Sequence, residues 1–217
     1  MIKVFLSYHH SVRKIAGRMK GYLSALGMDV FLAHEDLEPS DEWQEEILKK
    51  LRECDVFIPL LTKNFHSSLW TDQETGIAVA RNKLIVPVKF SVVPYGFIGK
   101  FQALKARKEL DDTCWRIVQK VASKPAFRKG MRDGVIKAFL ESRSFEESAR
   151  RAKMLVKFEP FSVTQLNRIV EGGARNTQIY GGRAARDFVR KLIKENRPKI
   201  KRTPVRKFEK RVKSWPW

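Results

Sequence analysis

Four short apolar runs alternate with longer amphipathic segments along the first ninety residues, and this alternation constrains the fold most. The runs are Ile2–Ser7, Met28–Ala33, Asp55–Leu61 and Leu84–Phe90. The segments between them repeat apolar residues at helical spacing over Val12–Leu26, about Asp41 to Cys54, and a third stretch ending near Asn82. Nearly unbroken apolar strands belong to parallel sheets that helices cover on both faces. The sequence therefore predicts a doubly wound α/β fold.

After residue 90 the sequence predicts the last strand and helix of this domain, followed by a second, helical domain. "FQALKA" (101–106) is suited to a short fifth strand, and Asp111–Ser123 to a helix capped by Asp111. From Phe127 to about Asn196 only helical periodicity is visible, which indicates a small all-α domain. The last residues, 197–217, contain three prolines and many cations and are expected to be extended or poorly ordered. We thus expect domains at 1–124 and 125–196, and a basic tail at 197–217.

Positive charge is concentrated in the second half of the chain. Residues 1–100 hold 13 Lys and Arg against 12 Asp and Glu, whereas residues 183–217 hold 14 against 3. Phe208, Trp215 and Trp217 lie among the cations of the tail, a pattern that can follow a phosphate backbone and stack on bases. No base-reading motif accompanies it, so a solvated basic tail or a partner-docking segment remains an alternative. The expected partner of this region is an effector protein or a polyanion.

Several classes of protein are disfavoured by what the sequence lacks. Two cysteines, Cys54 and Cys114, form neither a disulfide framework nor a metal cluster. No apolar run approaches the roughly 20 residues of a membrane span, and "MIKVFLSYHH" does not have the form of a signal peptide. We expect a cytoplasmic protein without a membrane association.

The stretch "SLWTDQETGIAVA" (68–80) carries the strongest candidate site. In doubly wound sheets, ligands bind beyond the carboxyl ends of the strands, and the helix predicted here begins at that edge. Trp70 and Glu74 are four residues apart, so they share one helix face. An indole face can hold a cation, and a carboxylate can stabilise positive charge that develops in a reaction. The alternative is a surface tryptophan beside a solvated glutamate.

The order of these features over residues 1–106 resembles a TIR domain. The resemblance rests on a strand ending "FLSY", an acidic loop "HEDLEPSDEW", and the run "DVFIPLLTKNFHSSLWTDQETGIAVARNKLIVPV". It implies a flavodoxin-like parallel sheet and self-association through TIR domains. In enzymatic TIR domains the glutamate is catalytic and the aromatic residue one turn before it lies against nicotinamide, roles that carry over to Glu74 and Trp70. The sequence departs from many members at Thr71, where they have cysteine, and at Pro39–Ser40, where they have glycine.

Cleavage of the nicotinamide–ribose bond needs only one carboxylate. Nicotinamide leaves as a neutral group from a cationic pyridinium, so no general acid is required, unlike ordinary glycoside hydrolysis. The chain has no Gly-x-Gly-x-x-Gly loop, so NAD+ is expected to be a substrate and no cofactor is predicted. The candidate substrate-binding residues at this sheet edge are Ser7, Tyr8, His9, Leu37 and Trp70.

His9 and His10 are adjacent, and adjacent side chains of an extended chain point to opposite sides. This disfavours a metal site, and no metal is predicted, but it leaves one of the two able to touch a phosphate or ribose.

Two functions from different classes follow from these observations. The first is an NAD+ nucleosidase or ADP-ribosyl cyclase that, by resemblance, acts in prokaryotic immune (anti-phage) signalling. The second is a non-enzymatic TIR adaptor that binds other proteins, with a basic C-terminal region that binds nucleic acid. The residues do not decide between a linear and a cyclic product.

Overall fold

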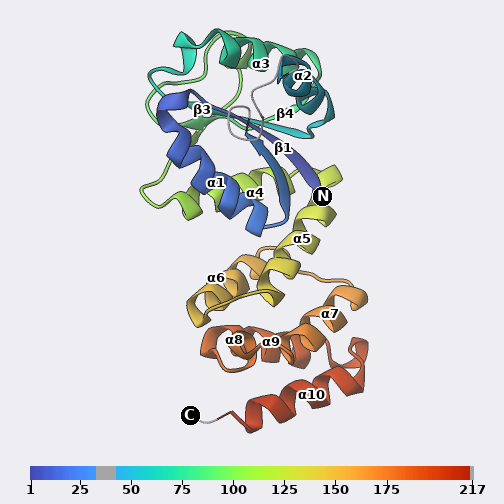
Figure 1. Ribbon diagram of the computed structural model, residues 1–217. Helices are drawn as coiled ribbons and strands as arrows, with labels where there is room; N and C mark the ends of the chain where they lie inside the picture. The colour runs from blue at the N-terminus through green and yellow to red at the C-terminus, as the bar shows by residue number, and fades with distance from the viewer. Residues whose placement is uncertain (33–42, 216–217) are drawn as a thin grey trace. The chain divides into compact units, whose positions relative to one another are not determined.

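The computed structural model describes residues 1–32 and 43–215. The acidic loop with Leu37, and Trp217 at the end of the chain, therefore lie outside the described residues. The chain divides into two compact units, Met1–Met131 and Arg132–Trp217 (Figure 1). The division falls inside helix α5 (Pro125–Leu140), which begins one residue after the predicted end of the first domain.

The first unit is built on a parallel sheet. Its strands are β1 (Ile2–Ser7), β2 (Met28–Leu32), β3 (Val56–Leu61), β4 (Leu84–Ile85), β5 (Val88–Lys89) and β6 (Leu104–Lys105). Their order is β2-β1-β3-β5-β6, with β4 also paired to β3, and every pairing is parallel. All six residues of β3 are buried, as the unbroken apolar run predicts. The predicted α/β fold with a flavodoxin-like strand order is confirmed.

The prediction of one continuous fourth strand over Leu84–Phe90 is wrong. The structure has two short strands there, β4 and β5, separated by Val86 and Pro87. Proline has no backbone N–H, so it cannot donate to the neighbouring strand and interrupts the ladder. Its carbonyl still accepts from the Leu104 N–H at 2.8 Å, so the chain stays in the sheet.

Helices cover both faces of this sheet. They are α1 (Arg13–Ala25), α2 (Trp43–Glu53), α3 (Leu69–Ala80) and α4 (Leu110–Ala122). Helices α1 and α4 pack together, as do α2 and α3, on opposite sides of the sheet (Figure 1). Gly27 follows α1 with φ of 90°, a left-handed conformation that suits glycine at a helix end. The predicted cap of the last helix is wrong: Glu109 precedes α4, and Asp111 lies in its first turn, where a negative charge suits the helix dipole.

The first unit has a dense apolar core that includes both thiols of the chain. Phe5 and Phe57 stack on neighbouring strands, and Cys54 belongs to the cluster around them. Cys114 is fully buried in α4. Burial raises the pKa of the Cys54 thiol to about 11 and that of Cys114 to about 12.

The second unit is all-α, which confirms the predicted helical region. Its helices after α5 are α6 (Phe145–Val156), α7 (Val163–Gly173), α8 (Thr177–Tyr180), α9 (Arg183–Glu195) and α10 (Arg202–Lys213). The prediction of an extended or poorly ordered tail is wrong, because α10 lies within it and packs against α7. Val205, Phe208 and Val212 follow one face of α10 at helical spacing, and all three are buried.

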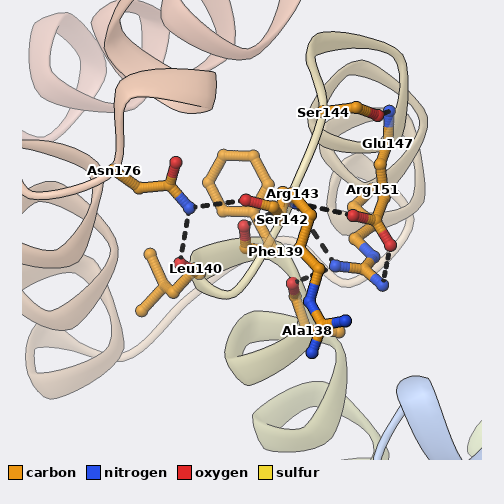
Figure 2. Close-up of polar contacts among 9 residues, drawn as sticks. All are labelled: Ala138, Phe139, Leu140, Ser142, Arg143, Ser144, Glu147, Arg151 and Asn176. Atoms are coloured by element: carbon orange, nitrogen blue, oxygen red, sulfur yellow. Dashed lines mark hydrogen bonds and ion pairs between the residues drawn. The ribbon is translucent and has the colours of Figure 1, made fainter.

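A polar network holds the turn between α5 and α6 (Figure 2). The Arg151 guanidinium donates to the Ala138 carbonyl at 2.6 Å and pairs with Glu147, whose other oxygen accepts from the Arg143 N–H at 2.7 Å. The Asn176 side chain donates to the carbonyls of Leu140 and Ser142, each at 2.9 Å. These bonds give side-chain donors to carbonyls in the last turn of α5 and just after it, where few intrahelical donors remain.

Within the described part of the chain, no helix is both long and apolar enough to cross a membrane.

Candidate active site

A buried carboxylate lies at the carboxyl edge of the sheet. Glu74, in the second turn of α3, is 1% exposed, and the Ser7 hydroxyl at the end of β1 donates to its Oε2 at 2.5 Å. Its Oε1 is buried and has no hydrogen-bond partner among the residues that the structure describes. Burial raises the pKa of Glu74 to about 7, and the Ser7 hydrogen bond opposes this rise.

The position of this pair follows from the strand order. β2 lies on one side of β1, and β3 and the later strands lie on the other side. The order in which strands are added across the sheet therefore reverses between β1 and β3. Ser7 is level with Pro59 of β3, and Glu74 comes from the helix that follows β3. The hydrogen bond therefore spans the topological switch point, where ligands of doubly wound sheets bind.

Trp70 forms an aromatic pair that the sequence interpretation missed. Its ring is half-buried and lies 4.5 Å from the ring of Trp43, centroid to centroid, at an angle of 59°. Trp43 is the first residue of α2. Trp43 is the last residue of the segment "HEDLEPSDEW" (34–43), and no role in substrate binding was predicted for it.

A second group that the sequence interpretation missed links the first turn of α3 to His66, just before the helix, and to Tyr95, after β5. Asp72 accepts from the Tyr95 hydroxyl at 2.5 Å through one oxygen and pairs with His66 Nδ1 at 2.7 Å through the other. The rings of His66 and Tyr95 meet edge to face at 4.7 Å. Burial and the Asp72 carboxylate raise the pKa of Tyr95. Thr71 adds hydrogen bonds to the carbonyls of Phe65 and Ser68, so this end of α3 is firmly held.

The remaining predicted residues have different environments. Tyr8 is buried, with 1% exposure, whereas His9 is partly exposed. The expectation that His9 and His10 point to opposite sides is wrong: their ring centroids are 4.0 Å apart. The chain leaves the extended conformation at His10, where a short 3₁₀ helix begins, and His9 Nδ1 accepts from the Ser11 N–H. Burial, and then the neighbouring His10, lower the pKa of His9.

The structure brings Ser7 and Glu74 into direct contact and places Trp70 against Trp43. Leu37 lies outside the described residues, so its predicted role stays a prediction. Among residues 1–32 and 43–215, no group of three or more His, Cys, Asp and Glu side chains is arranged to hold a metal ion. Chemically, the site offers one carboxylate that can change its charge near neutral pH, with one oxygen able to accept a hydrogen bond.

Comparison with known proteins gives the following matches. The model of the TIR domain family matches residues 4–118, a range that contains Ser7, Trp70 and Glu74. A protein from Brachypodium distachyon, named "probable 2′ cyclic ADP-D-ribose synthase BdTIR", is 24% identical over 94 residues, which are 42% of this chain and 42% of that protein. The match thus spans less than half the length of that relative.

Two solved structures are also similar to this chain. The TIR domain of the Toll-related receptor TRR-2 from Hydra magnipapillata is 20% identical, with a TM-score of 0.46, and the match covers 54% of this chain and 94% of that domain. The TIR domains of the activated Roq1 resistosome, which recognises the effector XopQ, are 17% identical, with a TM-score of 0.39, and the match covers 73% of this chain and all of that one.

Proposed function

This chain belongs to the TIR domain family, and on that premise we propose that its first unit cleaves the bond between nicotinamide and ribose in NAD+. The observation that carries the proposal is Glu74, a carboxylate with 1% exposure whose Oε1 has no partner in the described structure. A buried acceptor without a partner is costly to stability, and such costs are concentrated at functional sites. The name of the Brachypodium relative, which refers to a cyclic ADP-ribose, supports a reaction on the same bond.

In the proposed reaction the electron pair of the broken bond passes to the pyridinium nitrogen. Nicotinamide leaves neutral, and positive charge develops on the ribose. Ionised Glu74 stabilises that charge, because a fixed anion acts strongly in a site that excludes water. Ser7 holds Oε2, which leaves Oε1 to accept from a ribose hydroxyl.

We assign the Trp70 and Trp43 pair to the cationic nicotinamide ring. An indole face attracts a cation by about 0.5–2 kcal/mol, and the attraction ends when the ring becomes neutral. Water then attacks the ribose carbon and releases a proton to the solvent, which gives ADP-ribose, or the adenosine part of the substrate attacks, which gives a cyclic product. Either product suits a role in signalling, and the anti-phage role implied by the resemblance is part of this proposal.

The test is nicotinamide release from NAD+ by the purified full chain, with the nucleotide product identified by mass spectrometry. Glu74→Gln keeps the shape of the side chain and removes its charge, so we expect release to fall by about 10²–10³-fold. Glu53→Gln is the matched control, because Glu53 is exposed and pairs with Lys3 at the amino end of β1, the opposite edge of the sheet. The control should retain the activity of the parent.

Two outcomes would contradict the proposal. Equal release by the parent and Glu74→Gln would place the chemistry elsewhere in the chain. A parent protein that self-associates but releases no nicotinamide, before or after association, would favour the non-enzymatic adaptor.

A further inference from the structure

The second unit has a large excess of basic over acidic residues. Residues 132–217 hold 23 Lys and Arg against 9 Asp and Glu. We propose that a groove between α7 and α10 of this unit binds the sugar–phosphate backbone of a nucleic acid. The proposal concerns the second unit alone and does not depend on NAD+ cleavage.

The groove consists of two hollows that meet at α7. Each has a volume of about 550 Å³, and both are lined by Glu171 and Arg175. One is also lined by Arg168 of α7 and by Lys201, which directly precedes α10. The other is also lined by Lys207, Lys210 and Arg211 of α10. Because the two hollows share lining residues, they offer adjacent contacts that an extended strand can use together.

The charge of the groove is strongly unbalanced. Among the described residues that line it, Glu171 is the one acidic side chain, and Arg175 already pairs with it. Lys207, Lys210 and Arg211 are exposed and form no ion pair with the described residues. Cations that line one groove repel one another, so an anionic ligand would relieve the repulsion as well as gain attraction.

The packing of α10 favours a nucleic acid over a membrane surface. A helix that binds a membrane inserts its apolar face between the lipids. The apolar residues of α10, Val205, Phe208 and Val212, are buried in the protein, so the exposed side of the helix presents cations. Cations without an apolar flank are the usual means of contacting phosphates along a strand.

The experiment compares two triple variants of the full chain. Lys207→Gln, Lys210→Gln and Arg211→Gln together remove three charges from the groove. Arg183→Gln, Arg190→Gln and Lys194→Gln together remove three exposed charges from α9, outside the residues that line the groove. Binding to a fluorescent 20-nucleotide strand, as DNA, RNA and duplex, is followed by anisotropy as the KCl concentration rises.

The parent is expected to bind with an affinity that falls steeply with salt. Each lost phosphate contact reduces the slope of log K against log salt by about 0.7–0.9, so the groove variant should lose about 2–3 from its slope. The α9 variant should keep the slope of the parent. The three forms of the probe distinguish single strands from duplexes and DNA from RNA.

Three results would overturn the proposal. Equal loss in both triple variants would mean that net charge alone is responsible. Displacement of the oligonucleotide by polyglutamate at the same charge concentration would indicate an acidic protein partner. Binding to phosphatidylserine vesicles without binding to any oligonucleotide would indicate a membrane. Circular dichroism checks the fold of each variant. If the triple variant unfolds, the single substitutions Lys207→Gln and Lys210→Gln replace it, and each is expected to lower the slope by about one.

Discussion

Replacing the buried carboxylate of Glu74 with an amide should stabilise the protein in a pH-dependent manner. Burial raises the pKa of Glu74 from 4.5 to about 7 in the folded protein. Each pH unit of difference between the folded and unfolded pKa corresponds to about 1.4 kcal/mol, so the ionised side chain lowers the free energy of unfolding by about 3 kcal/mol. Glu74→Gln does not ionise and avoids this cost.

The sign of the effect fixes the pH range in which it is seen. Between pH 4.5 and 7 the folded protein keeps the proton on Glu74, whereas the unfolded chain has lost it. The free energy of unfolding of the parent therefore falls as the pH rises through this range and levels off above about 7. The advantage of Glu74→Gln over the parent should thus grow by about 3 kcal/mol from pH 4.5 to 8 and then remain constant.

The assay is urea unfolding followed by tryptophan fluorescence at a series of pH values, for the parent, Glu74→Gln and the control Glu53→Gln. In contrast to Glu74, the pKa of Glu53 is lowered by its hydrogen bond to Lys3, so the control should show no gain with rising pH. If the difference between Glu74→Gln and the parent is the same at pH 4.5 and at pH 8, the carboxylate does not titrate near neutrality and our reading of the site is wrong.

Three further predictions concern the site and the second unit. Nicotinamide release should increase as the pH rises through about 7, because Glu74 must be ionised, and Ser7→Ala should move this increase to higher pH, because the Ser7 hydrogen bond lowers the pKa of Glu74; an unmoved pH profile would contradict this. Trp43→Ala removes the ring that packs on Trp70, an interaction of about 0.5–1.5 kcal/mol, and should raise KM for NAD+ by up to about tenfold; an unchanged KM would separate Trp43 from the substrate. Phe208→Ala should destabilise the second unit by about 3–5 kcal/mol in thermal unfolding while nicotinamide release persists, and a loss of release would show that the second unit is needed for the chemistry.

The parallel sheet was predictable because its signal is local. Each strand is a short apolar run, and helical spacing marks the segments between the strands. The site was predictable only in outline. The sequence placed Ser7 and Glu74 at one sheet edge, but their hydrogen bond joins residues 67 positions apart and depends on the strand order.

The features that the sequence did not reveal depend on contacts between distant segments. Tyr95 and Asp72 are 23 residues apart, and each looks like an ordinary polar residue on its own. The helix in the tail was not predicted for a different reason. Val205, Phe208 and Val212 have helical spacing, but the surrounding cations and prolines outweighed this short pattern, and the partner that buries them is α7.

The two cysteines make the first unit chemically distinguishable from the second. Both thiols belong to residues 1–131, both are buried, and burial raises the pKa of each, so at pH 8 they are protonated and covered. A thiol reagent such as iodoacetamide reacts with the thiolate, so it can label the chain only when the first unit opens. The rate of labelling therefore measures the opening of the first unit alone, because residues 132–217 contain no cysteine.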